Sequence, residues 1–480
     1  MKFRVEREAL GEAVAWVARA LPARPVIPVL SGLLIEAAGA GLTLSCFDYE
    51  VSARVVVPAE VAEPGTALVP GRLLAEIARS LPPREVEFSS AADMVRMSCG
   101  SAEFELVSLP VEEYPGLPEP PPPSGTVDGG ALAAAAAQVV PSASRDDTLP
   151  MLTGVCVDVD GRAMTLAATD RYRLAVRTVD WTPAVPGLRA AALVPARTLA
   201  DVARTMDAGT PVTVAFNAPG ADDSRSGGAS QAEPRPADGM ISFEGGGRRL
   251  TARLIGGDFI RYRSRFPAEF GCRADLPAEP FMAAVRRVSL VAERASPVRL
   301  TFGRDEVVIE AHTDGRARAA ESVRAAFTGA EPAISFNPNY LLDGLTAAAI
   351  CGAAARPHAG AGEAEPEPGR IRLEFTSPAK PALITWAGYD GDLAAEAAAA
   401  DADPEDASGA AGHENGDDPA GDDGDPARDD GDPASDSAGD DVATAAGETE
   451  ADAPTADAVP TFRYLVVPLR SPAAQGAARA

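Results

Sequence analysis

Residues 150–176 read PMLTGVCVDVDGRAMTLAATDRYRLAV and predict a β-hairpin followed by a turn and a third strand. Val155, Val157 and Val159 alternate with smaller or polar residues, which is the period of a half-buried strand. The pair Asp160-Gly161 is typical of a short hairpin turn. This stretch decides the fold because related sequence occurs at two other places in the chain.

The related hairpins lie at residues 29–57 and 296–323. Each hairpin stands between two segments with apolar residues at helical spacing. The helices expected before the hairpins span 6–21, 129–140 and 279–292, and those expected after them span 69–81, 194–206 and 336–348. Strand-rich sequence closes each copy. Three copies in one order predict an α+β fold of three repeated units, each with two helices and antiparallel sheets.

The expected domain boundaries follow the linkers and insertions. We place the domains at 1–120, 125–267 and 272–470, a tail at 471–480, and insertions at 217–239, 353–369 and 391–460. The last insertion holds 22 acidic residues against one arginine, a net charge of −21 that leaves −6 of the chain's −27 for the rest. We expect it to be disordered because it has little apolar surface to bury. It is a loop rather than a tail, since residues 462–470, FRYLVVPLR, predict a final strand.

Arginines recur at equivalent places on two of the expected helices. Arg72 and Arg79 are seven residues apart, as are Arg197 and Arg204, so each pair shares a helix face. In the helix 69–81 that face lies away from the expected apolar stripe, which comprises Leu73, Leu74, Ile77 and Leu81. One interpretation is a solvated surface with long arginine side chains. The recurrence favours a surface that contacts phosphates without reading sequence.

Several function classes are disfavoured by motifs that the sequence lacks. The five cysteines have no CxxC spacing and indicate buried free thiols in a reducing compartment. The start of the chain is charged where a signal peptide is apolar, and no run is long enough to span a membrane, so we expect a cytoplasmic protein. No phosphate loop, nucleophile elbow or zinc motif is visible, and we expect no enzyme activity, cofactor or metal. Asp48 and Asp170 are interpreted as turn residues.

The chain resembles the β sliding clamp of bacterial DNA polymerase III, especially its actinobacterial form. The resemblance rests on MKFRVEREAL, LPARPVIPVLSGLLIEA, FDYEVSARV, SLPVEEYPGLP, DDTLPMLTGV, AATDRYRLAVR, FNPNYLLDGL, SPAKPALIT and YLVVPLR together. It implies a DNA clamp fold with three domains, closed head to tail into a homodimeric ring whose helices line the hole. Such a ring is a non-catalytic processivity factor: it encircles duplex DNA without sequence specificity and tethers the polymerase III α subunit, the clamp loader and other proteins with a clamp-binding motif.

The resemblance also implies site residues. Arg24, Arg72 and Arg197 would touch DNA, and the helix pattern adds Arg79 and Arg204. A loop that reaches DNA, and that carries paired tyrosines in some clamps, has Pro150-Met151 here. The peptide pocket between domains 2 and 3 would comprise Leu152, Thr169, Arg171, Tyr172, Arg173, Leu174, Ile260, Leu465, Val466, Val467, Pro468, Leu469 and Arg470. At the ring joint, the matching positions are Phe104 and Leu290.

Alternatives stay open for some residues and for the function. Taken alone, Leu174 and Val466 favour ordinary core, and only the family pattern reverses this interpretation. Phe104 and Leu290 are equally consistent with ordinary core. Ile260 follows Asp-Phe where the family usually has proline after the aromatic residue, so partner preference is expected to differ. A specialised clamp paralogue in repair or regulation, or a repeat-built protein scaffold without DNA binding, are the competing functions.

Overall fold

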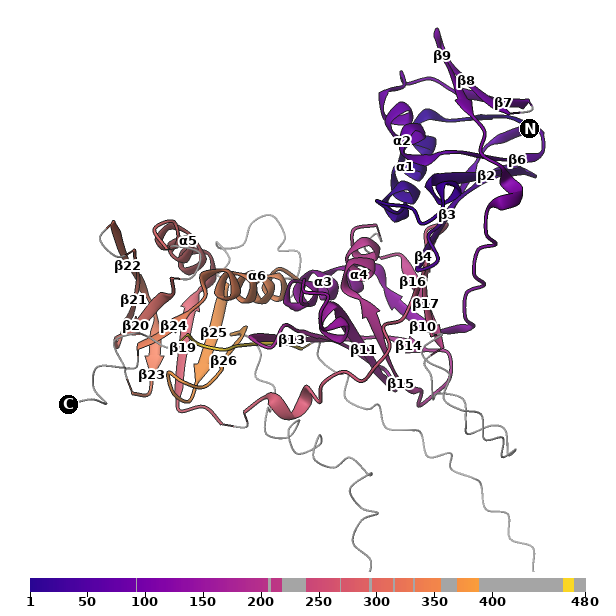
Figure 1. Cartoon of the computed structure of the whole chain (residues 1–480). Coiled ribbons are helices and arrows are strands. Elements are labelled where there is room, and N and C mark those ends of the chain that lie inside the picture. The colour runs from indigo at the N-terminus through magenta and orange to yellow at the C-terminus, as the bar shows by residue number, and fades with distance from the viewer. Residues whose placement is uncertain are drawn as a thin grey trace, which may run out of the picture.

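The computed structural model describes residues 1–91, 93–205, 209–217, 239–267, 269–292, 296–313, 316–330, 333–354, 369–387 and 461–469 (Figure 1). The predictions for the insertion 391–460, for most of the other two insertions, and for the tail lie outside the described residues. So does Arg470.

The first unit consists of nine strands and two helices. They are β1 (Lys2–Val5), α1 (Arg7–Val17), β2 (Gly32–Ala38), β3 (Gly41–Phe47), β4 (Val51–Pro58), β5 (Glu60–Glu63), β6 (Gly65–Pro70), α2 (Gly71–Ser80), β7 (Val86–Ala91), β8 (Met94–Cys99) and β9 (Ala102–Val107).

The second unit repeats this order. It contains β10 (Pro123–Asp128), α3 (Gly129–Val139), β11 (Gly154–Asp160), β12 (Ala163–Thr169), β13 (Arg173–Asp180), β14 (Thr182–Pro183), β15 (Arg189–Pro195), α4 (Ala196–Ala203), β16 (Pro211–Asn217), β17 (Met240–Gly245) and β18 (Arg248–Arg253).

The third unit repeats it again. It contains β19 (Cys272–Pro277), α5 (Ala278–Ser289), β20 (Val298–Phe302), β21 (Glu306–Thr313), β22 (Ala317–Arg324), β23 (Ala326–Thr328), β24 (Ala333–Phe336), α6 (Pro338–Ala354), β25 (Arg370–Phe375), β26 (Ala382–Trp386) and β27 (Phe462–Val466). The predicted threefold α+β repeat with antiparallel sheets is confirmed.

Two nine-stranded sheets cross from one unit to the next. One has the order β14-β10-β16-β17-β18-β4-β3-β2-β6 and joins units 2 and 1. The other has the order β15-β11-β12-β13-β27-β26-β25-β19-β23 and joins units 2 and 3. Within the described residues, a five-stranded sheet ends at β9 and a four-stranded sheet ends at β22. Figure 1 shows α5, α6, α3 and α4 in a row along one side of the sheets, with β9 and β22 at opposite ends of the chain of units.

The stripe expected on the helix 69–81 is buried with one exception. Leu74 and Ile77 of α2 are buried, but Leu73 is 45% exposed, so its assignment to the stripe is wrong. Leu73 is next to Leu74 in sequence, about 100° around the helix, and therefore points away from the core that Leu74 enters. The helix α4 ends at Ala203, earlier than expected, and α6 continues to Ala354.

The cysteines are free thiols, as predicted. Four of them are buried and Cys351 is partly exposed. Burial raises the pKa of Cys46 and of Cys156 to about 12, which keeps both thiols protonated at neutral pH. None of the described helices is long and apolar enough to cross a membrane.

Candidate nucleic-acid and peptide-binding surfaces

The predicted DNA-contacting arginines are exposed. Arg72 and Arg79 lie on α2, opposite its buried face, and Arg197 and Arg204 flank the two ends of α4. Arg72 donates a hydrogen bond to the carbonyl of Pro22 at 3.1 Å. These side chains are therefore accessible, and their contact with DNA stays a prediction.

Two further predicted contacts lie in loops. Arg24 is exposed in the segment between α1 and β2. Pro150 and Met151 begin a short 3₁₀ turn, Pro150–Thr153, just before β11, and both are exposed. An exposed thioether offers an apolar contact but no positive charge for a phosphate.

The predicted peptide site lies where units 2 and 3 meet, which we call the second junction. There β13 pairs antiparallel with β27, so that Arg173 lies opposite Val466 and Leu174 opposite Leu465. The turn before β13 is held by Asp170, whose Oδ1 accepts the backbone N–H groups of Tyr172 and Arg173, each at 3.0 Å. Asp170 is thus a turn residue, as predicted.

The side chain of Arg173 fills the second junction and is only 10% exposed. Its Nε donates to Asp170 Oδ2 at 3.0 Å, its Nη1 to Asp343 Oδ2, and its Nη2 to the carbonyl of Pro141. The guanidinium also lies 4.5 Å from the centre of the Tyr340 ring. Burial alone would lower the pKa of Arg173, but Tyr464 and the two carboxylates outweigh burial and raise it, so the cation persists.

Beside this cation lies an apolar surface that is partly open. Tyr172 is 52% exposed, and Met151, Val467 and Leu469 are also exposed. The backbone N–H of Val467 donates to the carbonyl of Tyr172 at 2.8 Å, which ties the end of β27 to the turn. Arg171 is exposed and Ile260 is half-buried. The remaining predicted residues are buried: Leu152, Thr169, Leu174, Leu465, Val466 and Pro468.

This burial separates the predicted pocket residues by accessibility. Leu174 and Leu465 pack into one apolar cluster with Ile260 at its margin, beneath the open surface. Val466 is fully buried in the main core. A ligand would meet the four exposed side chains directly and the buried ones only through them. The sequence did not reveal this distinction, nor did it reveal Asp343, which the fold brings to Arg173 from α6.

The two predicted ring-joint residues are far apart in one chain. Phe104 lies on β9 of unit 1, half-buried against the core. Leu290 follows α5 in unit 3 and is 84% exposed. Such a high exposure of a leucine side chain at a helix end is consistent with a surface that a partner covers.

No group of His, Cys, Asp and Glu side chains among the described residues could hold a metal ion. The two candidate surfaces instead offer exposed cations on helices and an apolar patch beside a buried cation. These features suit binding to polyanions and to peptides with apolar anchors.

Comparisons with known proteins agree with this arrangement. Family models of the DNA polymerase III beta subunit match three segments: the N-terminal domain at 1–118, the central domain at 126–260 and the C-terminal domain at 263–351. The beta sliding clamp of Streptomyces coelicolor is 47% identical over 80% of this chain and 94% of its own length. The beta sliding clamp homolog GriR of Streptomyces muensis is 43% identical over 72% of this chain and 88% of its own.

A solved structure shows the same fold. The DNA polymerase sliding clamp of Bacillus subtilis superimposes with a TM-score of 0.70 at 21% identity, covering 98% of this chain and 99% of that one. The family models together match more than half of the chain, and the Streptomyces coelicolor relative is similar along nearly its whole length. The chain therefore belongs to the family of DNA polymerase III beta subunits, the bacterial beta sliding clamps.

Proposed function

We propose that two copies of the chain close head to tail into a ring that encircles duplex DNA and tethers replication proteins to it. The partners are the polymerase III α subunit, the clamp loader and other proteins with a clamp-binding motif. The ring acts in the cytoplasm, without catalysis and without a cofactor, as the processivity factor of DNA polymerase III. The observation that carries this proposal is the pair of sheet edges, β9 and β22, at opposite ends of the chain.

The two junctions within the chain follow the same rule of strand pairing. In each, the fourth strand of one unit pairs with the last strand of the next unit: β4 with β18, and β13 with β27. The register is also the same, because Ala53 lies opposite Leu250 and Ala175 opposite Tyr464. By this rule β22 pairs with the last strand of another unit 1, which is β9 of a second copy.

Pairing β22 with β9 would complete a third nine-stranded sheet. The five strands that end at β9 and the four that end at β22 have the same orders as the two halves of each complete sheet. The joint needs the second copy, because one chain holds these edges apart at its two ends (Figure 1). Two such joints close a head-to-tail dimer.

The strand sequences fit this closing joint. Ala319 of β22 is half-buried against the core at the place of Ala53 and Ala175, so it would face Phe104 of the second copy. One residue along, Arg318 would face Glu105, and on the other side Ala320 would face Glu103. Within a chain Arg318 bridges to Glu310 and Glu105 to Arg96, so the joint would extend a row of alternating charges.

A disulfide trap tests the ring and its register. Opposed Cα atoms in antiparallel strands lie about 4.5–5.5 Å apart, within the range of a disulfide. We expect the double variant E103C/A320C to form a covalent dimer on mild oxidation, seen by non-reducing electrophoresis. In the matched variant E105C/A320C the two cysteines are two residues out of register, so it should form little covalent dimer. Equal cross-linking of the two, or none of either, would exclude this joint.

DNA would pass through the ring, next to the helices that line its inner surface. The exposed arginines on α2 and α4 would neutralise phosphates without reading bases, and such contacts weaken as salt rises. A lining that holds phosphates weakly lets the ring slide, while the closed sheets prevent it from leaving.

The apolar surface at the second junction is the proposed site for clamp-binding peptides. We expect Leu469→Glu to weaken binding of a peptide from the polymerase III α subunit at least tenfold, because it sets a carboxylate against the peptide's apolar anchors. Fluorescence anisotropy measures this affinity. Val56→Glu, at an exposed apolar position on β4, is the control and should bind normally. Normal peptide affinity in the Leu469 variant would show that the peptide does not bind at this surface.

A further inference from the structure

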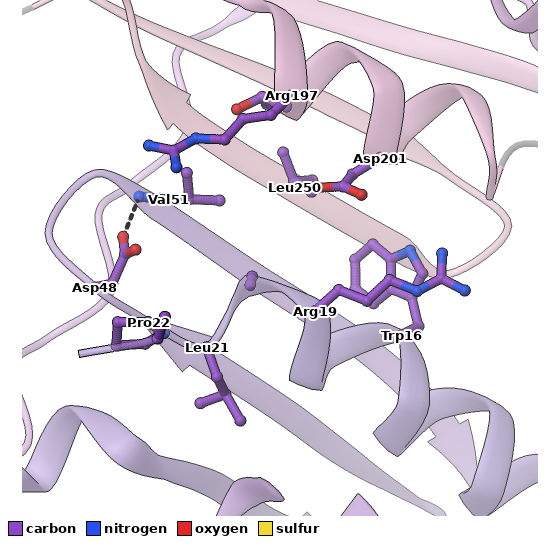
Figure 2. A pocket seen from close by; sticks show the side chains of 12 residues that line it. Trp16, Arg19, Leu21, Pro22, Asp48, Val51, Arg197, Asp201 and Leu250 are labelled. Atoms are coloured by element: carbon purple, nitrogen blue, oxygen red, sulfur yellow. Dashed lines mark hydrogen bonds between the residues drawn. The ribbon is translucent and has the colours of Figure 1, made fainter. Parts of the chain in front are cut away.

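The junction between units 1 and 2, which we call the first junction, contains a cavity of about 230 Å³. It lies between the end of α1, the turn before β4, the start of α4 and β18 (Figure 2). The lining residues that matter here are Trp16, Asp48, Val51, Thr198, Asp201 and Leu250.

The same place at the second junction is filled by Arg173. Val51 is the counterpart of Arg173, because each begins the joining strand and lies opposite the equivalent residue, Ala252 or Val466. Asp48 is the counterpart of Asp170: its Oδ1 accepts the N–H groups of residues 50 and 51, at 3.0 and 2.6 Å.

The helices provide the other counterparts. Asp201 of α4 and Asp343 of α6 each follow a fully buried leucine, Leu199 or Leu341, by two residues. Thr198 then corresponds to Tyr340, and Leu250 corresponds to Tyr464 through strand register. The first junction therefore keeps both carboxylates that hold the Arg173 guanidinium, but it has lost the arginine and the two tyrosines around it.

A buried hydroxyl points to a missing partner. Thr198 lines the cavity and is 2% exposed, yet its Oγ1 has no hydrogen-bond partner in the described part of the chain. A buried polar group without a partner is unusual in native structures. The hydroxyl can accept a hydrogen bond from a ligand that enters between the carboxylates.

We propose that this cavity binds a guanidinium group, the arginine side chain of a partner protein, in the place that Arg173 occupies at the second junction. A planar fork of N–H donors can bond two carboxylates at once, and Trp16 adds an aromatic side chain to the cavity lining. A lysine ammonium lacks the fork and the flat face. Arg19 and Arg197 stand at the cavity, both exposed, and neither forms an ion pair within the described residues. Arg204, an exposed residue at the end of α4, already pairs with Asp201, so Arg204 and Arg197 are the internal competitors that the test must exclude.

The first test supplies the guanidinium from the chain itself. Val51→Arg recreates the arginine of the second junction and should raise the temperature of the first unfolding transition by about 2–4 °C over Val51→Gln, which is long but uncharged. Adding Asp48→Asn and Asp201→Asn to V51R should remove that rise. An equal melting temperature for V51R and V51Q would contradict the proposal.

The second test uses the wild-type chain, without DNA or polymerase, so that its result is separate from the proposed function. N-acetyl-arginine amide should shift the methyl NMR signals of Val51 and Leu250, while the citrulline analogue, a neutral urea of the same shape, should not. V51R and the D48N/D201N variant should lose the response. Equal shifts from the two probes would overturn the proposal. So would a response that appears only in Arg197→Ala or only in Arg204→Ala, because that arginine would then already occupy the carboxylates of the wild-type chain.

Discussion

Replacing Leu290 by aspartate is expected to convert the dimer into monomers. Leu290 stands at the place of Arg19 in unit 1 and Pro141 in unit 2, because each lies two residues after the last buried valine of its unit's first helix. Arg19 lines the cavity at the first junction together with residues of unit 2, and the carbonyl of Pro141 accepts a hydrogen bond from Arg173 at the second junction. In the closing joint Leu290 would touch unit 1 of the second copy, where Leu73 and Phe104 hold the places of Thr198 and Leu250.

The expected loss is large because the three side chains would form one apolar contact in the proposed joint. Leu73 and Leu290 are exposed in the single chain, and closure of the proposed ring would bury them. A buried carboxylate there would cost about 2 kcal/mol or more per joint, by analogy with central interface residues. Two joints give about 4 kcal/mol, close to a thousandfold in Kd.

Analytical ultracentrifugation across a dilution series measures that change. Val185→Asp is the control, since Val185 is also an exposed apolar residue but lies in the loop between β14 and β15 of unit 2, outside the proposed joint of β9 with β22. If the Leu290→Asp variant stays dimeric down to the same concentration as the wild type, Leu290 does not contribute to the joint.

Replacing Arg173 by methionine is expected to open the second junction. Arg173 is 10% exposed and binds Asp170, Asp343 and the Pro141 carbonyl, so its loss leaves Asp170 nearly buried without a cation. Breaking one partner of a buried pair costs about 3–5 kcal/mol. We expect the lower value, about 3 kcal/mol, because Asp343 is 42% exposed and can be hydrated.

Hydrogen exchange locates this opening. A loss of about 3 kcal/mol speeds exchange of the β13 and β27 amides about a hundredfold, while the β4–β18 pair at the first junction keeps its protection. Val51→Ala is the control at the equivalent place and should leave both junctions protected, because Val51 holds no ion pair. Unchanged exchange in Arg173→Met would show that strand pairing alone holds units 2 and 3 together.

The repeated pattern in the sequence was sufficient to predict the fold. Hairpins at 29–57, 150–176 and 296–323, each between two amphipathic segments, predicted units whose strands and helices follow one order. The turn roles of Asp48 and Asp170 were also predictable, because an aspartate between two strands bonds its own following backbone N–H groups. These signals depend on residues that are neighbours in the chain, so they can be recognised in a single sequence.

The contacts between units were not predictable from one sequence in the same way. Arg173 meets Asp343, which is 170 residues away, and no local pattern relates them. Leu73 fits an apolar stripe by spacing but stays exposed, because its packing partner is expected on another chain. The cavity at the first junction emerges only when Val51 is set beside Arg173, and that alignment depends on strand register.

The most direct measurement of the closed ring is retention on DNA of two topologies. The dimer is loaded by a clamp loader onto nicked circular DNA, and the DNA is then cut once or left intact before gel filtration at a salt concentration that suppresses weak phosphate contacts. Topological enclosure predicts that the protein stays with the intact circles and is lost once they are cut. Equal retention on circular and linear DNA, or none on either, would contradict enclosure.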